Sequence, residues 1–147
     1  MGDSKRQITP YRNGKAGLIA GLCQEIGVDQ VFNEHLTQNT GRPPEIAYGD
    51  LVQMLLMSMG DEHYPLSRLD EYLENLDLEA LIKCKADISQ LNDDRFGGFL
   101  DQMHNAGGAE ILSGIAVRAF QHYGILLKSV NYDTTSKIMW GEYKTQE

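Results

Sequence analysis

Cysteine is scarce in this sequence. Only Cys23 and Cys84 are present, far apart, and neither belongs to a Cys-x-x-Cys or Cys/His spacing. Zinc sites and disulfide-stapled small domains both need several cysteines at short intervals. Both classes are therefore excluded, and two free thiols in a reducing compartment are expected.

Long apolar runs are absent as well. No run approaches the about 20 residues that a membrane-spanning helix needs. The first residues, MGDSKRQITPYRNGK, are polar and lack the apolar segment of a secretory signal. We expect a cytoplasmic protein with no membrane partner.

Basic charge is the third shortage. The chain has 13 Lys and Arg against 21 Asp and Glu, a net charge of -8. Strong DNA binding needs clustered cations to neutralise phosphates. The densest group, and therefore the candidate DNA contacts, is Lys5, Arg6, Arg12 and Lys15. So few contacts predict weak binding that fades steeply with salt.

The composition is otherwise that of an ordinary globular protein. The spacing of its apolar residues predicts a mainly α fold. The 147 residues are 41% hydrophobic, about one domain by length. Apolar residues at helical spacing predict helices over 17–26, 49–59, 66–76, 93–106 and 109–123, with shorter ones around 31–36 and 78–82. Residues 1–14 are interpreted as a flexible lead-in and residues 15–124 as a helical domain.

Several residues mark where these helices begin and end. Asp77 and Asn92 are expected N-caps, whereas Gly27 and Gly124 stand where helices should stop. The segment 49–59 is apolar on nearly all sides, which predicts a helix at the centre of the core.

Two acidic groups could suggest metal sites. Asp61, Glu62 and His63 are consecutive, so their side chains diverge, and a solvated turn is the better interpretation. Asp93, Asp94 and Asp101 could form an acidic cluster, but the first two are explained without a metal, because acids in a first turn complement the helix dipole.

The stretch from Ile125 to Tyr143 has a different pattern. Two strand-like runs flank Asp133, and a β-hairpin over 125–140 is predicted with this acid near its tip. A carboxylate on a rigid strand is suited to binding Mg²⁺. The alternative is that Asp133 begins a turn and bonds nearby backbone N–H groups.

Three segments together resemble a known family. Leu91-Asn92-Asp93-Asp94-Arg95, Tyr132-Asp133-Thr134-Thr135-Ser136 and Gly141-Glu142-Tyr143 resemble the N-terminal region of bacterial insertion-sequence transposases of the DDE class, in the Tn5-like branch. The stretch His63-Tyr64-Pro65-Leu66 shares the likeness, which runs from about residue 18 to 143.

The resemblance implies a role for Asp133. It matches the first catalytic acid, on the first strand of an RNase H-like domain, so residues 125–147 would be the start of that domain. The full-length parent would use Mg²⁺ or Mn²⁺, held with two later acids that this chain does not contain. We therefore expect a truncated transposase that needs no cofactor and has no activity alone.

Three functions stay open at this stage. The chain could contribute contacts with transposon-end DNA or with another protomer. A homo-oligomer is expected, because the strands of a hairpin that lacks its neighbouring strands have unpaired backbone groups that can pair with a second copy. It could instead be a non-catalytic interaction module that inhibits transposition. A haloacid dehalogenase-like phosphatase is the weakest interpretation, because its pattern needs a second Asp where Thr135 stands.

Overall fold

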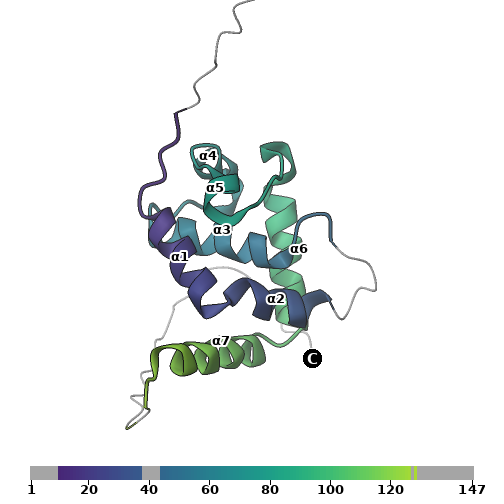
Figure 1. Cartoon of the computed structure of the whole chain (residues 1–147). Helices are drawn as coiled ribbons and strands as arrows, with labels where there is room; N and C mark the ends of the chain where they lie inside the picture. The colour runs from purple at the N-terminus through teal and green to yellow at the C-terminus, as the bar shows by residue number, and fades with distance from the viewer. Residues whose placement is uncertain (1–9, 38–43, 127, 129–147) are drawn as a thin grey trace, which may run out of the picture.

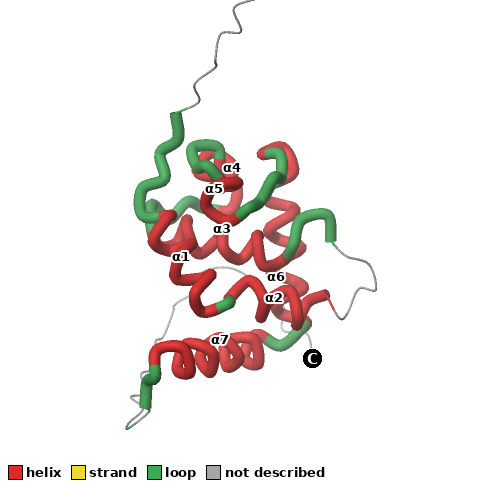
Figure 2. The backbone as a smooth tube through the Cα atoms, viewed as in Figure 1, coloured by secondary structure: helices red, strands yellow, loops and turns green. Residues whose placement is uncertain are grey.

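The computed structural model describes residues 10–37, 44–126 and 128, and in these residues the chain forms helices and loops (Figures 1 and 2). The helices are α1 (Ala16–Ile26), α2 (Val28–Thr37), α3 (Tyr48–Gly60), α4 (Leu69–Leu73), α5 (Leu78–Ile82), α6 (Asp93–Asn105) and α7 (Gly108–Tyr123), with 3-10 turns at Leu66–Arg68 and Ile88–Gln90. The mainly helical prediction is confirmed for this part. Asp133 and nearly all of the expected hairpin lie outside it.

Helix α3 occupies the middle of the molecule (Figure 1). Its side chains Leu51, Met54 and Met57 are almost completely buried, and α1, α2, α4 and α6 all pack against it. An apolar helix of this kind is stable in water only when it is enclosed on nearly every side. The expectation of a central helix is therefore confirmed.

Helices α2 and α3 approach each other closely at Gly49. A Cβ at this position would lie 2.7 Å from the carbonyl oxygen of Asp29 and 2.8 Å from its Cα atom. The Gly49 N–H donates to Oδ1 of Asn33 at 2.8 Å. The absence of a side chain is thus what lets the two helices approach.

The expected helix ends are also present. Gly27 (φ 76°) and Gly124 (φ 62°) adopt the left-handed conformation that glycine accepts without a steric penalty. Asp77 accepts a hydrogen bond from the N–H of Ala80, and Asn92 accepts one from the N–H of Arg95 at 2.9 Å. Short-range signals therefore predicted these boundaries correctly.

Two local features differ from the prediction. The helix expected over 66–76 is interrupted, because Arg68 has a φ of -135° that breaks the helical ladder, and α4 covers only Leu69–Leu73. The turn Ile88–Gln90 was not predicted. Its signal was an Asp three residues before a Gln: the side chain of Asp87 accepts from the N–H of Ser89, and Gln90 bonds back to the N–H of Asp87.

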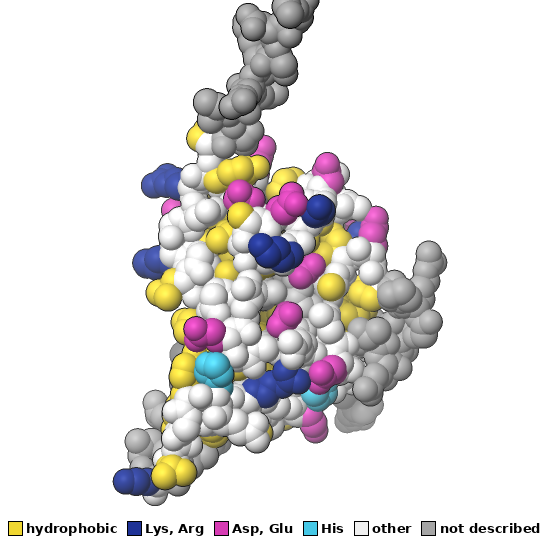
Figure 3. Space-filling model, viewed as in Figure 1, with side chains coloured by type: hydrophobic (Ala, Val, Ile, Leu, Met, Phe, Trp, Pro, Cys, Tyr) yellow, Lys and Arg dark blue, Asp and Glu magenta, His cyan; other side chains and the backbone are white. Residues whose placement is uncertain are grey.

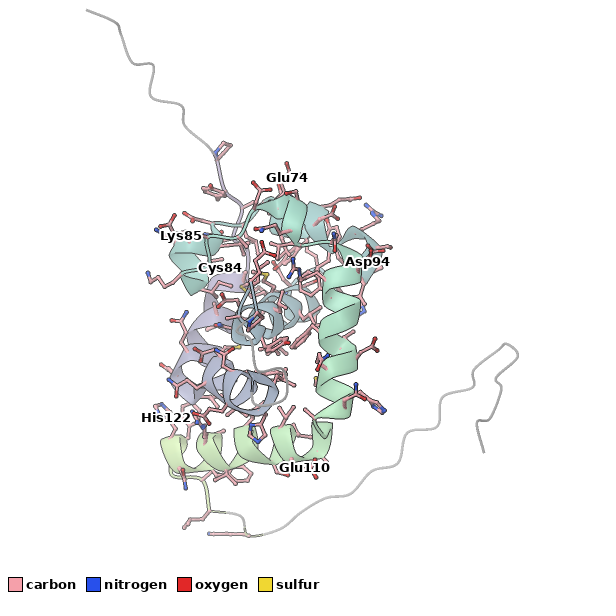
Figure 4. All side chains as sticks on the ribbon, turned by 90° about the vertical axis from the view of Figure 1, so that its right-hand side faces the viewer. Glu74, Cys84, Lys85, Asp94, Glu110 and His122 are labelled. Atoms are coloured by element: carbon pink, nitrogen blue, oxygen red, sulfur yellow. The ribbon has the colours of Figure 1, made fainter. Side chains whose placement is uncertain are left out.

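Helix α7 packs less completely than its periodicity suggested. One apolar face was expected to be buried, but only Ile111 is fully buried, and Ile115 is packed partly against the core. Leu112 is 68% exposed. Figure 4 shows α7 crossing the end of α6, with Glu110 and His122 marking its two ends.

Both cysteines are free, as expected, and the structure shows that both are buried. Cys23 lies in α1 and Cys84 follows α5, and each is enclosed by the same core. Within the described ranges, no helix is both long enough and apolar enough to cross a membrane.

The contact at Gly49 generates the first prediction. Gly49→Ala should lower the free energy of unfolding by about 1–3 kcal/mol, because its Cβ would collide with the backbone of α2. Gly21→Ala is the matched control: it lies inside α1, and its Cβ would meet nothing within 4 Å. It should raise stability by up to about 1 kcal/mol through helix propensity. Urea unfolding measures both, and equal effects would contradict this packing.

Candidate functional site

A groove of about 460 Å³ lies between the segment that leads into α3 and the first half of α6. It contains three residues of the LNDDR segment, namely Asn92, Asp94 and Arg95. The remaining lining residues are Pro44, Glu45, Ile46, Tyr48, Leu51, Gly98, Phe99 and Gln102. The groove is the candidate site because it gathers polar residues of the segment on which the family resemblance rests. Figure 4 shows Asp94 at the start of α6.

Arg95 braces one wall of the groove. Its Nε donates to the carbonyl oxygen of Gln90 at 3.2 Å, and its terminal NH2 donates to Oε2 of Glu45 at 3.0 Å. The Gln90 amide donates to the other oxygen of Glu45 at 2.6 Å. The guanidinium of Arg95 therefore links α6 to the segment before α3. Because it is already bound to Glu45, it is poorly placed to bind a phosphate.

The floor of the groove is aromatic. The ring of Phe99 stacks with that of Tyr48, with centroids 6.1 Å apart, and lies 5.8 Å from that of Phe32. Gly98 sits beside them in α6, where an added Cβ would meet nothing within 4 Å. Internal packing does not require this glycine, and its absent side chain keeps the groove open.

The rim of the groove carries more acid than base. Glu45 and Asp94 are exposed carboxylates, and the one cation among the described lining residues, Arg95, is already bound by Glu45. Gln102 adds an amide. A rim of this kind repels phosphate and accepts hydrogen bonds from N–H groups, which a peptide segment supplies.

A second hollow, of about 410 Å³, adjoins the groove on the other side of the Pro44–Ala47 segment. Burial raises the pKa of the Asp50 carboxyl; the Cys84 thiol bonded to it lowers that pKa, and the charge of Asp29 raises it. Burial likewise raises the pKa of the Cys84 thiol. A thiol that resists deprotonation is a poor nucleophile, so covalent chemistry at Cys84 is disfavoured.

The candidate DNA contacts lie away from the groove. Arg12 is exposed and lines a small hollow together with Asp61 and Glu62, while its backbone N–H donates to the carbonyl of Asn75. Lys15 is exposed just before α1. Lys5 and Arg6 lie outside the described residues, as does Asp133, the predicted catalytic and metal-binding acid.

The two acidic segments lie in the turn after α3 and in the first turn of α6. The Asp61 carboxylate accepts from the Tyr72 hydroxyl at 3.3 Å, and burial together with this partnership raises the pKa of Tyr72. Asp93 and Asp94 begin α6 behind the Asn92 cap. In the described part of the chain, no three His, Cys, Asp or Glu side chains are grouped so that they could hold a metal.

Sequence reasoning found the LNDDR segment but not the groove beside it. Glu45 and Tyr48 carry no motif, and they line the same groove as Arg95 only because α6 packs against α3. No local signal links Glu45 to Arg95, which lies 50 residues further along the chain.

Comparison with known families places the chain in one class. Residues 12–117 match the family described as Domain of unknown function (DUF4277), and the chain belongs to this family. The match covers α1 to α6 and the first part of α7, including every residue of the groove. No curated protein and no solved structure matches the chain.

The half-buried acid Asp50, next to the groove, generates a prediction about pH. Because the pKa of Asp50 is raised in the folded state, its stabilising contribution is present below the unfolded pKa of about 3.9 and lost as pH rises through the folded value. At neutral pH the half-buried charge of Asp50 therefore lowers the stability of the fold. Asp50→Asn should raise the free energy of unfolding at neutral pH, and the gain should vanish well below pH about 4.

Asp93→Asn is the matched control, since Asp93 is an exposed acid in the first turn of α6. Asp93→Asn should lower the free energy of unfolding by about 0.3–1 kcal/mol, because it removes a negative charge that interacts favourably with the helix dipole. Urea unfolding across pH compares the two. A loss of stability for Asp50→Asn equal to that of Asp93→Asn would contradict the account of this hollow.

Proposed function

We propose that this chain is the N-terminal part of an insertion-sequence transposase of the DDE class, acting in DNA transposition and recombination. The observation that carries the proposal is the order LNDDR (91–95), YDTTS (132–136) and GEY (141–143) in one chain. The helical architecture supports it, because the resemblance implies a helical region ahead of the first catalytic strand.

Within such a protein, the helical part would serve chiefly in protein contacts. Four of its cations, Arg68, Lys85, Arg95 and Arg118, form ion pairs with carboxylates. On the face drawn in Figure 3, acidic and basic side chains are interspersed rather than gathered into a basic patch. Together with a net charge of -8, this favours a protein partner over DNA.

Asp133 would supply one of three metal-binding acids. Together with the two later acids that the resemblance implies, it would hold two divalent ions, Mg²⁺ or Mn²⁺, which would supply metal-assisted phosphoryl transfer. One carboxylate cannot hold both ions, so catalysis in such a protein would need all three acids. A chain that kept only the contact surfaces would act as an interaction module or an inhibitor of transposition.

The proposal predicts self-association without salt-resistant DNA binding. In analytical ultracentrifugation with a labelled duplex of transposon-end sequence, the chain should sediment as a dimer or larger species. DNA should co-sediment only at low salt, because few phosphates are neutralised. Arg12→Ala with Lys15→Ala should abolish that low-salt complex and leave the self-association unchanged.

Two outcomes would contradict this division of roles. The first is a monomer at every concentration. The second is a sequence-specific DNA complex that persists at physiological salt. A scrambled duplex of the same length is the control that separates specific recognition from general attraction to phosphates.

A further inference from the structure

The side of α7 that lies along α1 and α2 changes character halfway along the helix (Figure 1). Helical spacing places on this side Ile111, Gly114, Ile115, Arg118 and His122. Ile111 is buried, and Ile115 packs partly against the core. A Cβ on Gly114 would lie 3.4 Å from Cγ1 of Val31. Apolar packing therefore holds the first half of α7, whereas polar side chains occupy the second half of the same face.

Arg118 joins the second half of α7 to the end of α1 and the start of α2. Its Nη1 donates to Oε1 of Gln30 at 2.9 Å and to the carbonyl oxygen of Gly27 at 3.4 Å. Its Nη2 donates to the Glu34 carboxylate at 3.2 Å and forms an ion pair with it. A Cβ on Gly27 would lie 2.7 Å from Nη1, so the absent side chain at Gly27 makes room for the guanidinium.

The interface beneath this second half is polar and hollowed. A depression of about 490 Å³ lies there, and its lining includes Gln24, Gln30, Gln121 and His122. Beyond it, the hydroxyl of Tyr123 donates to the Glu25 carboxylate at 2.8 Å on the exposed surface. Water already reaches these groups, so the second half of α7 can leave α2 chiefly by exchanging polar contacts for hydration.

The start of α7 is suited to act as a pivot. Helix α6 ends at Asn105 and α7 begins at Gly108, so two residues join them. One of the two, Gly107, has a φ of 86°, and hinges often lie at small residues at the ends of elements. Ile111 is buried in the first turn of α7, close to this joint. A rotation of α7 about Ile111 therefore moves Arg118 much further than it moves Ile111.

We propose that α7 is a strap whose second half opens away from α2, with Arg118 as the latch and Ile111 as the pivot. A single ion pair contributes little when its arginine is 32% exposed. The guanidinium of Arg118 contributes more, because it binds a carboxylate, an amide and a carbonyl together. The latch keeps α7 closed, yet it breaks without unfolding the core. The inference does not depend on the proposed function.

Distances between pairs of spin labels in the full chain test this. Leu22, exposed on α1, is the common reference position. Gln121 reports on the second half of α7 and Ser113 on the first half, and both are exposed. The labels are attached to Leu22→Cys with Gln121→Cys, or to Leu22→Cys with Ser113→Cys, while the buried native thiols react slowly. Pulsed electron paramagnetic resonance measures each pair with and without Arg118→Met, a change that preserves helix propensity.

Arg95→Met is the matched control. Arg95 forms an ion pair with Glu45 on α6, and its side chain is 31% exposed, against 32% for Arg118. Arg118→Met should extend the distances between positions 22 and 121 to longer values and leave those between 22 and 113 unchanged. Arg95→Met should change neither pair. Circular dichroism confirms that each variant is folded.

Salt provides a second measurement that needs no change at Arg118. Raising the salt from about 0.1 M to about 1 M shortens the screening length from about 10 Å to about 3 Å. The distances between positions 22 and 121 should lengthen with salt in the chain that keeps Arg118. They should respond little in the Arg118→Met chain, where the ion pair is already lost.

Three results would overturn the proposal. Distances between positions 22 and 121 that ignore both Arg118→Met and salt would show that Arg118 does not hold α7 closed. Lengthening of both pairs together would mean that α7 leaves as a whole, without a pivot at Ile111. An equal effect of Arg95→Met would assign the opening to a general loss of stability. If Arg118→Met fails to fold, the salt measurement decides.

Discussion

The structure depends on enclosing α3, a helix that is apolar on almost every side. Removing Leu51, Met54 and Met57 from water stabilises the fold only if neighbouring helices surround them. Gly49 allows α2 to approach closely enough to do so. The arrangement of α1, α2, α4 and α6 follows from this requirement.

The position of the groove is a consequence of the same packing. Helix α6 must lie against α3 to bury Phe96 and Phe99, and this brings its first turn beside the segment at Glu45. The bonds of Arg95 then fix the distance between the two walls. Burial of apolar side chains thus places the two walls of the groove side by side, and polar contacts hold them there.

Much of the helical part could be predicted from the sequence, because its signals are local. The periodicity of α3, the Asn92 cap and the glycine at 124 act within a few residues. The groove could not be predicted, since it joins Glu45 to Arg95 across 50 residues. The exposed side of α7 was also missed: periodicity showed an apolar helix, but it could not show that only the side with Ile111 meets the core.

The central claim is that α3 is the element whose enclosure holds the domain together. Native-state hydrogen exchange tests this directly, because each amide reports the free energy of the opening that exposes it. The account predicts that the amides of Leu51 to Met57 exchange only through global unfolding, with the same free energy as urea denaturation gives. Exchange of these amides through a smaller opening, while those of α1 and α6 stay protected, would contradict it.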